Sequence, residues 1–386
     1  MPHYYSLGKI PPKRHTQFRD ESGKLYSEQL FSTEGFSSNY CTLYHIHPPT
    51  QIIRCEEPID VSPKECTDNI LKHRSFQGFK IKPEAEYLAS RKTLLFNDDC
   101  QLSLGAPQGG LGEDIFYRNS DSDEIIFIHE GKGTVYTQYG KLPFEYGDYI
   151  HIPRGIIYQI EFETKDNRIL VVEAHSPIVP PKRYMSRYGQ LLEHSPFCER
   201  DFRKPEYCEP IDRKGEFLVK SKKRGLMYNM WYANHPFDVV GWDGCEYPYI
   251  FSIHDFEPIT GRVHMPPPIH QTFEAHNLVI CSFVPRMYDY HPLAVPAPYH
   301  HSNIDSDELL YYVDGEFMSR KHVERGMITL HPSGIPHGPH PGAIEKSIGQ
   351  KETKELAVMV DTFHSLKMTQ EAQQIEDENY IMSWAE

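Results

Sequence analysis

Side chains that could bind a metal or move a proton gather in two short stretches of the C-terminal third. The stretch HHSNIDSDE contains His300, His301 and Glu308, and the stretch LHPSGIPH contains His331 and His337. Imidazole and carboxylate ligands suit Fe(II), and they also suit Mn(II) or Zn(II), so ligand type alone does not identify the metal. Whether these groups meet depends on the strands and turns that carry them.

The first of these stretches is repeated earlier in the chain. Residues 117–131 read YRNSDSDEIIFIHEG and residues 301–315 read HSNIDSDELLYYVDG, with Asn119, Glu124 and Gly131 each 184 positions before Asn303, Glu308 and Gly315, as in 303 − 119. A second pair follows in the same order, GDYIHIPRGIIY from position 147 and GMITLHPSGIPH from position 326. Two copies of one β unit are therefore predicted, because a repeat sets the architecture.

These paired motifs resemble the cupin signature, in which a strand pair carrying His and Glu is followed by a Gly-Pro-Gly turn with one more His. The resemblance implies one jelly-roll barrel per copy, which makes a bicupin. In the second copy it places His301, Glu308 and His337 inward, a set of two imidazoles and one carboxylate that leaves coordination sites open for substrate and dioxygen. Neighbouring residues of a strand face opposite sides, and alignment through Asn303 favours His301 over His300.

The first copy lacks two of these three groups. Tyr117 and Tyr158 stand where the second copy has its histidines, although Glu124 remains. One carboxylate cannot hold a metal alone. We therefore predict one metal site per chain, in the C-terminal half, with a structural role for the N-terminal barrel.

The remaining pattern favours strands over helices. Short β-branched and aromatic runs separated by Gly turns, such as EIIFIHEGKG and NRILVVEA, are typical of barrels and sandwiches. We expect an all-β dominated fold. Its parts are an irregular N-terminal arm with short strands (1–90), an N-terminal cupin-like barrel without metal (91–177), a connecting region (178–245), and a C-terminal cupin barrel with the metal site (246–386) that ends in a short helical tail from Thr369.

Composition limits the class of protein. The chain has 386 residues and a formal net charge of −14, which disfavours nucleic-acid binding. No run of about 18 apolar residues predicts a membrane span, and the N-terminus lacks the apolar segment of a signal peptide. Eight cysteines without a CxxC pair favour reduced thiols. We expect a cytoplasmic protein.

Wider blocks of sequence closely resemble homogentisate 1,2-dioxygenase. The blocks are PYHHSN, the dipeptide PR at 285–286, LHPSGIPHGPHPG and, near the start, KRHTQF, EGFSSN and YHIHPPT. The resemblance implies Fe(II) held by His301, Glu308 and His337, with His337 also touching bound substrate. It places His331 beside the substrate, where the residue could alternatively support a metal ligand or have only a surface role. It also implies a homo-oligomer, with trimers pairing into hexamers.

The same resemblance implies a general base. His264 in HMPPPI fits the family's His-x-x-Pro-x-Ile setting, and His270 is the competing candidate, which would also contact substrate. One position departs from the family, because Phe317 stands where the family has a tyrosine that helps to bind the substrate carboxylate. A phenyl ring cannot donate that hydrogen bond. Nearby Tyr311, Tyr312 or Arg286 could compensate.

Three functions stay open at this point. The first is dioxygen-dependent ring cleavage of homogentisate to maleylacetoacetate, a step in tyrosine and phenylalanine breakdown. The second is ring cleavage of another aromatic acid, of the gentisate or 3-hydroxyanthranilate type, which would share the metal ligands and differ in the substrate anchors. The third is a non-catalytic ligand-binding bicupin, which predicts no bound metal and no oxygen uptake.

Overall fold

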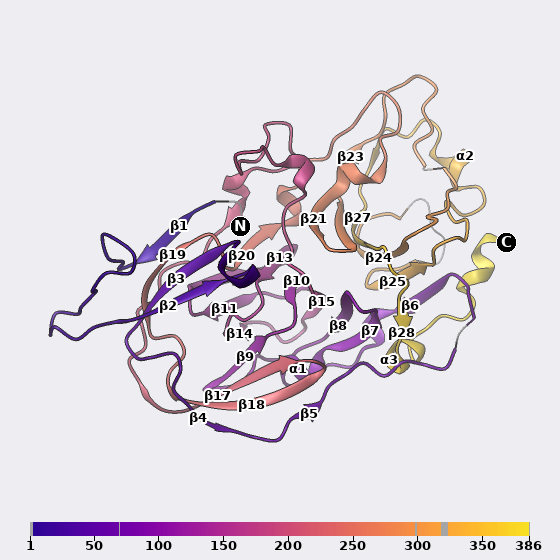
Figure 1. Cartoon of the computed structure of the whole chain (residues 1–386). Helices are drawn as coiled ribbons and strands as arrows, with labels where there is room; N and C mark the ends of the chain where they lie inside the picture. Colours follow the sequence, from indigo (N-terminus) through magenta and orange to yellow (C-terminus); the bar gives the residue numbers. More distant parts are fainter. Residues whose placement is uncertain (1–2, 69, 298, 318–322, 386) are drawn as a thin grey trace.

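The structure is a computed structural model that describes residues 3–68, 70–297, 299–317 and 323–385. Strands dominate it, and its helices are short (Figure 1). The expected all-β fold with two barrels and a short helical C-terminal tail is confirmed. In Figure 1 the N-terminal barrel lies at the lower left, and the C-terminal barrel, in orange and yellow, lies at the upper right.

The N-terminal barrel consists mainly of two eight-stranded sheets. The first sheet carries the strand of Glu124 at its centre and pairs β10 with β13 and β15. In spatial order, its strands are β16 (Phe202–Arg203), β20 (Tyr249–Ser252), β13 (Asp148–Ile152), β10 (Asp123–Glu130), β15 (Arg168–Ala174), β8 (Cys100–Gly105), β7 (Lys92–Phe96) and β28 (Lys367–Met368).

The second sheet of this barrel contains the long hairpin of β17 and β18. The hairpin joins the sheet through a parallel pairing of β17 with β9. In spatial order, the strands are β12 (Gly140–Phe144), β11 (Gly133–Thr137), β14 (Tyr158–Phe162), β9 (Ile115–Asn119), β17 (Lys214–Lys223), β18 (Leu226–Asn234) and β4 (Ile52–Cys55), and β5 (Ile59–Asp60) also pairs with β18.

The C-terminal barrel is built on a six-stranded sheet and a small two-stranded one. Most of the central strands β27 and β24 is buried, and their pairing has one register shift, between Tyr312 and Asp314. The order is β21 (Gln271–Ala275), β22 (Leu278–Phe283), β27 (Leu356–Thr362), β24 (Asp307–Asp314), β25 (Met327–His331) and β6 (Arg74–Gln77), and the small sheet pairs β23 (Arg286–Met287) with β26 (Glu352–Thr353).

The N-terminal arm carries short strands, as expected. Three of its strands form a four-stranded sheet against the N-terminal barrel, and Figure 1 shows the following segment running past β4 and β5 to β6 in the other barrel. The strands of this sheet are β1 (Tyr5–Gly8), β19 (Val239–Gly244), β3 (Tyr40–His45) and β2 (Ser27–Ser32).

Several strands pair with a sheet on the other side of the expected boundaries at residues 90, 177 and 245. The region 178–245, expected to connect the two halves, instead supplies β17, β18 and β19 to sheets of the N-terminal half. Strands β20 and β28, beyond residue 245, also join the N-terminal barrel, whereas β6 of the arm joins the C-terminal one. Strands that pair over long sequence separations leave no local pattern, so short sequence motifs could not predict which half each strand joins.

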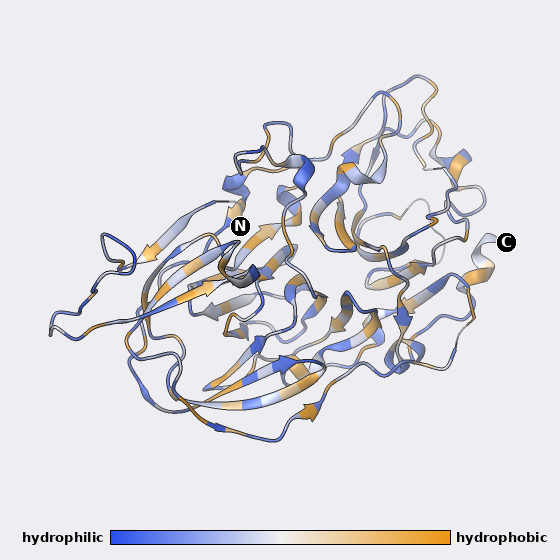
Figure 2. Cartoon of the chain, in the orientation of Figure 1, coloured by the Kyte–Doolittle hydropathy of each residue, from blue (hydrophilic) through white to orange (hydrophobic). Residues whose placement is uncertain are grey.

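One buried apolar cluster extends through both barrels. It includes Ile126 and Phe127 of β10 together with Leu309 and Tyr311 of β24. Figure 2 shows hydrophobic residues distributed along the strands of both barrels. Polar contacts also cross between the barrels, since the Tyr149 hydroxyl lies 2.9 Å from the Ser282 hydroxyl. The strand β24, which carries Glu308, is therefore packed against the N-terminal barrel.

The helices are few and short. Over the residues that the structure describes, they are α1 (Tyr87–Ser90), α2 (Ala343–Ser347), α3 (Gln370–Gln373) and seven 3-10 segments, the last of which, η7 (Tyr380–Trp384), closes the C-terminal tail. Thr369 begins α3, and its hydroxyl accepts a hydrogen bond from the Ala372 amide. Within the described parts of the chain, no helix has the length and apolar character needed to cross a membrane.

Candidate metal centre and active-site cavity

Two turns and one strand bring the predicted metal ligands together. Glu308 is the second residue of β24, while His301 precedes that strand and His337 follows β25. The backbones of the two histidines pair as an isolated antiparallel bridge, in which each amide donates to the other residue's carbonyl at 2.8 Å. This bridge places both imidazoles beside the start of β24.

The two imidazoles point the same nitrogen at the carboxylate. Nε2 of His301 lies 3.8 Å from Oε2 of Glu308, and Nε2 of His337 lies 3.5 Å from Oε1. On the far side of each ring, Nδ1 contacts a backbone carbonyl at 3.3 Å, that of Tyr299 for His301 and that of Ile335 for His337. Such a contact on Nδ1 turns Nε2 toward the place where a metal would sit.

Glu308 carries its negative charge in a buried position. Burial by itself would raise the pKa of this carboxyl, but the imidazoles of His301, His331 and His337 close to it lower that pKa well below its ordinary value. Only 7% of Glu308 is exposed. An ionised carboxylate buried in this way needs opposite charge or several donors close to it.

The donor set fits a metal ion. One ligand atom from each of His301, Glu308 and His337 lies within 4.8 Å of the other two. Ligands bound about 2.1 Å from a metal and adjacent to one another lie roughly 3 Å apart, so small side-chain rotations would complete the site. Nε2 of His337 is buried and makes no hydrogen bond of acceptable geometry within the described residues. That orphaned nitrogen supports a ligand role, because buried polar atoms rarely stay unpaired.

His331 lies behind the carboxylate. It directly opposes Glu308 in the pairing of β24 with β25, and its Nδ1 lies 2.8 Å from Oε1 of Glu308. Nε2 of His331 lies 3.2 Å from the Tyr380 hydroxyl in the C-terminal tail. The surface role that the sequence left open is wrong, since His331 is 0% exposed. The position of His331 suits support of the metal ligand Glu308. Contact of His331 with substrate stays a prediction, because His331 does not line the apolar cavity that opens beside Glu308.

A cavity of about 150 Å³ opens beside Glu308 and His301. Apolar side chains form most of its wall, and an apolar cavity of about this size can hold one benzene ring. His337 lies outside the lining, so its contact with substrate also stays a prediction. The apolar wall residues are Ile259, Met265, Pro267, Ile269, Phe283, Met287, Pro296, Ala297, Leu310, Phe317, Ala357 and Met359.

Both candidate bases line this cavity, in different environments. Nδ1 of His264 lies 3.8 Å from Oδ2 of Asp289, and 34% of the His264 side chain is exposed. Partial burial lowers the pKa of His264, Asp289 opposes that shift, and Arg286 and His301 add to it. His270 is buried against the Phe283 ring with 4.6 Å between ring centroids, and burial lowers its pKa to about 3. His264 therefore has the acidic neighbour and the water access that suit a base.

Phe317 lines the cavity. The resemblance to the family predicts a substrate neighbour at this position. The Phe317 ring packs edge-on against Tyr312, with 4.8 Å between centroids. Of the residues considered as replacements for the missing hydroxyl, Tyr312 and Arg286 line the cavity. Tyr311 faces the other barrel, where its hydroxyl lies 2.5 Å from Nδ1 of His129.

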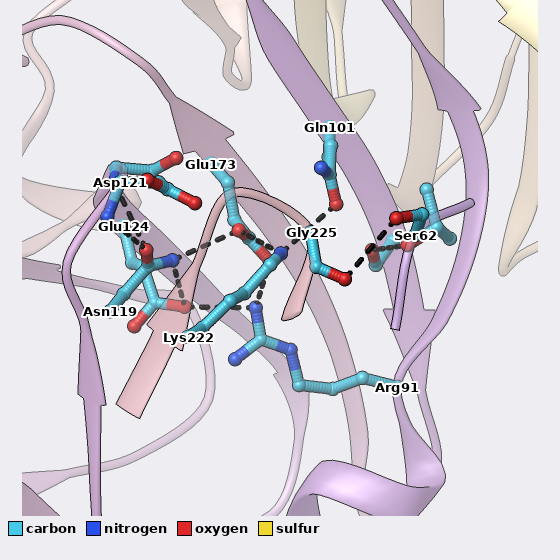
Figure 3. A network of polar contacts seen from close by, with 12 residues as sticks. Ser62, Arg91, Gln101, Asn119, Asp121, Glu124, Glu173, Lys222 and Gly225 are labelled. Carbon is cyan, nitrogen blue, oxygen red and sulfur yellow. Dashed lines mark hydrogen bonds and ion pairs between the residues drawn. The ribbon is translucent and has the colours of Figure 1, made fainter. Parts of the chain in front are cut away.

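The N-terminal barrel has an ion-pair network at the equivalent place (Figure 3). Glu124 accepts hydrogen bonds from Arg91 at 2.9 Å and from the Tyr158 hydroxyl at 2.8 Å. Arg91 also pairs with Glu173, whose second oxygen lies 2.6 Å from Nζ of Lys222. Cationic side chains already neutralise both carboxylates, so this position has no need of a metal.

Sequence reasoning missed three residues of the site. Asp289 is near His264, Tyr380 contacts His331, and Asp361 directly opposes Glu308 across β24 and β27. Burial and the charge of Glu308 raise the pKa of Asp361 well above its ordinary value. The repeat held one usable signal, because Glu173 opposes Glu124 in the same way in the first barrel.

The fold and the site together define a bicupin with a candidate metal centre in its C-terminal barrel. Residues 106–253 match the model of the family described as homogentisate 1,2-dioxygenase N-terminal. The chain is 39% identical, over all 386 residues and 99% of the relative's length, to a Saccharolobus solfataricus protein called "putative dioxygenase". It is 24% identical to homogentisate 1,2-dioxygenase of Rhizobium etli, over 98% of this chain and 89% of that enzyme.

The chain therefore belongs to the family of homogentisate dioxygenase-like cupin dioxygenases. Among solved structures, a cupin 2 conserved barrel domain protein from Leptotrichia buccalis aligns with 78% of this chain and 100% of its own, at 12% identity and a TM-score of 0.34. A score that low carries no argument here.

Proposed function

We propose that this protein is a non-haem Fe(II) dioxygenase that cleaves the ring of a dihydroxylated aromatic acid, with homogentisate as the first candidate substrate. The product would be maleylacetoacetate, formed by insertion of both atoms of O2, a step in tyrosine and phenylalanine breakdown. The observation that carries the proposal is the convergence of His301, Glu308 and His337 at one end of an apolar cavity. A relative named homogentisate 1,2-dioxygenase, matched over most of the chain, supports the choice of substrate.

His301, Glu308 and His337 would hold the iron. When bound, Fe(II) supplies a centre at which an aromatic diol and dioxygen can occupy neighbouring coordination sites. Two neutral imidazoles and one carboxylate leave such a centre with net positive charge, which favours binding of an ionised ring hydroxyl. The backbone bridge between the two histidines holds these residues side by side before substrate arrives.

The cavity wall would bind and orient the ring. Leu310 and Met359 lie directly opposite each other on β24 and β27, one step beyond Glu308. Their side chains and Phe283 offer apolar contact to a flat ring and exclude water around it. Holding the ring in one orientation next to the metal ligands converts binding energy into rate.

His264 would accept a proton from a ring hydroxyl. A histidine with a pKa lowered by partial burial is neutral at pH 7 and can act as a base. Asp289, 3.8 Å away, would stabilise the imidazolium after transfer. His270 remains the alternative, although its buried and neutral ring gives it a weaker claim.

A second substrate class has one observation in its favour. Phe317 lines the cavity in place of the family's tyrosine, so the carboxylate of homogentisate lacks that hydroxyl partner. Gentisate or 3-hydroxyanthranilate would use the same metal ligands with different anchors. A non-catalytic bicupin is the third possibility, and it requires that the triad bind no metal.

Oxygen uptake by iron-loaded protein tests these functions in parallel. Homogentisate, gentisate and 3-hydroxyanthranilate are offered separately, and dioxygen consumed and ring-opened product are measured. The proposal predicts one dioxygen consumed per homogentisate, with faster uptake than for the other two acids. Faster uptake with another acid would move the assignment to that substrate, and no uptake with any acid would leave the non-catalytic function.

Partners and location are part of the same proposal. We expect a small aromatic acid and O2 as the reactants, no nucleic acid, and a homo-oligomer of three or six chains. The eight cysteines, all within the described residues, form no disulfide bond, in keeping with a cytoplasmic location.

A further inference from the structure

The active-site cavity extends away from the metal ligands along β24. Glu308, Leu310 and Tyr312 alternate along this strand and all line the cavity. At about 3.3 Å per residue, the α-carbons of Glu308 and Tyr312 are roughly 13 Å apart. After allowance for the side chains, the space between the two ends suits a single ring with a short substituent.

Arg286 lies at the end far from the metal ligands. Ala357 opposes Tyr312 on one side and Phe283 on the other, so these three residues form one level of the barrel. The guanidinium carbon of Arg286 lies 5.6 Å from the centroid of the Phe283 ring. Arg286 therefore reaches the cavity at the level of Tyr312, two steps along the strand from Glu308.

Arg286 is paired with a carboxylate of the protein that also lines the cavity. Nη2 of Arg286 lies 3.1 Å from Oε1 of Glu355, and Nη1 donates to the Val284 carbonyl at 3.1 Å. The side chain of Glu355 is 23% exposed and that of Arg286 is 16% exposed. Glu355 can thus rotate toward water, while the guanidinium stays against Phe283.

Arg286 is the cationic group of the cavity wall that can bind an anion. Among the described residues of the lining, it is the one lysine or arginine. The same lining residues include three carboxylates. Glu308 faces the histidines, Asp289 lies near His264, and Glu355 pairs with Arg286. A substrate carboxylate buried in this apolar cavity needs a cationic partner, and the guanidinium fork matches carboxylate geometry.

We propose that Arg286 binds the carboxylate of the substrate, and that Glu355 occupies the guanidinium until the substrate displaces it. The proposal rests on the proposed function for the position of the other end of the substrate, at His301 and Glu308. It assigns a substrate class, a single-ring diol with a short anionic substituent whose carboxylate reaches the level of Tyr312. Arg286 would then replace the hydroxyl that Phe317 lacks.

Substitution of Arg286 tests the anchor. R286M keeps the length and apolar stem but removes the charge, and R286K restores a charge without the fork. Arg325, paired with Glu130 at 2.6 Å outside the cavity, gives the matched control R325M. For each variant, the KM is measured with iron-loaded protein. The Kd is measured by calorimetry with zinc-loaded protein under nitrogen. The compounds are homogentisate, its methyl ester and hydroquinone.

We expect R286M to weaken homogentisate about 10- to 100-fold, as for loss of a charge-assisted hydrogen bond, and to leave the two neutral compounds within about twofold. R286K should recover part of the loss, and R325M should behave as wild type. Equal weakening of acid and neutral compounds, or no weakening of the acid, would overturn the anchor.

The variant E355Q gives an independent test with the opposite sign. Removing the competing charge should lower the KM and Kd of homogentisate severalfold and leave hydroquinone unchanged. Weaker binding of the acid in E355Q would overturn the displacement. Calorimetry separates this proposal from the proposed function, because acid binding that depends on Arg286 would stand even if no acid supported oxygen uptake. Absence of acid binding to the wild type would overturn the anchor itself.

Discussion

Glu124 and Glu308 occupy the same position in the two barrels and have opposite surroundings. Glu124 is 0% exposed and accepts hydrogen bonds from Arg91 and Tyr158. Glu308 faces the imidazoles of His301 and His337 instead. One barrel therefore neutralises this carboxylate with side-chain cations and hydroxyls, and the other surrounds it with imidazoles that could hold a metal with it.

The ion pairs of Glu173 with Arg91 and Lys222 predict that loss of this carboxylate strongly lowers the free energy of unfolding. Glu173→Gln leaves Lys222 and Arg91 short of a buried partner, and we expect the free energy of unfolding to fall by roughly 3–5 kcal/mol. Glu130→Gln, in the more exposed pair with Arg325, should cost less than about 1 kcal/mol. Urea unfolding at pH 7 measures both, and equal losses would contradict the structural role of the network.

The same carboxylate predicts acid sensitivity. Burial opposes ionisation of Glu173, yet Lys222 and Arg91 lower its pKa from 4.5 to about 2. A carboxyl whose folded-state pKa is lowered stabilises the fold above its unfolded pKa, and that contribution is lost as pH falls from 4.5 toward 2. Unfolding midpoints between pH 7 and pH 3 should fall less steeply in Glu173→Gln than in wild type. Parallel pH profiles would show that Glu173 does not carry this effect.

His331 should set metal affinity without binding the metal. Its hydrogen bond to Oε1 of Glu308 orients the carboxylate, and loss of such an outer contact typically lowers metal affinity about 10- to 100-fold. We expect His331→Leu to show that loss in competition with a chelator. His129→Leu, another buried histidine that contacts a tyrosine, is the control and should keep wild-type affinity. Unchanged affinity in His331→Leu would remove His331 from the metal centre.

The pH dependence of turnover should separate His264 from His270. A base must be neutral, and burial lowers the pKa of His264, so the acid limb of kcat/KM should lie below pH 6.5. His264→Asn should lower kcat/KM by about 10²- to 10⁴-fold and remove that limb. His270→Asn should retain the limb. The reverse result would assign the base to His270.

The repeat made much of this architecture predictable from sequence. The pairs Asn119/Asn303 and Glu124/Glu308 indicated two β units, and the change from Tyr117 and Tyr158 to His301 and His337 located the candidate centre in the second. These signals are local, because each motif spans one strand and one turn. The structure brings those three predicted ligands within reach of one another.

Contacts between distant segments could not be predicted in this way. The pairings of β6 with β25 and of β28 with β7 join segments more than 250 residues apart, and no local pattern specifies them. The same holds for Tyr380 beside His331 and for Glu355 beside Arg286, since loop paths decide which side chains meet. The strands that residues 178–245 contribute to sheets of the N-terminal half were missed for that reason.

Iron content tests the central claim most directly. Wild-type protein, Glu308→Gln and Glu124→Gln are reconstituted with Fe(II) without oxygen, desalted and analysed for bound iron per chain. The account predicts about one iron in the wild type and in Glu124→Gln, and almost none in Glu308→Gln. Full iron in Glu308→Gln, or loss of iron only in Glu124→Gln, would contradict a metal centre in the C-terminal barrel.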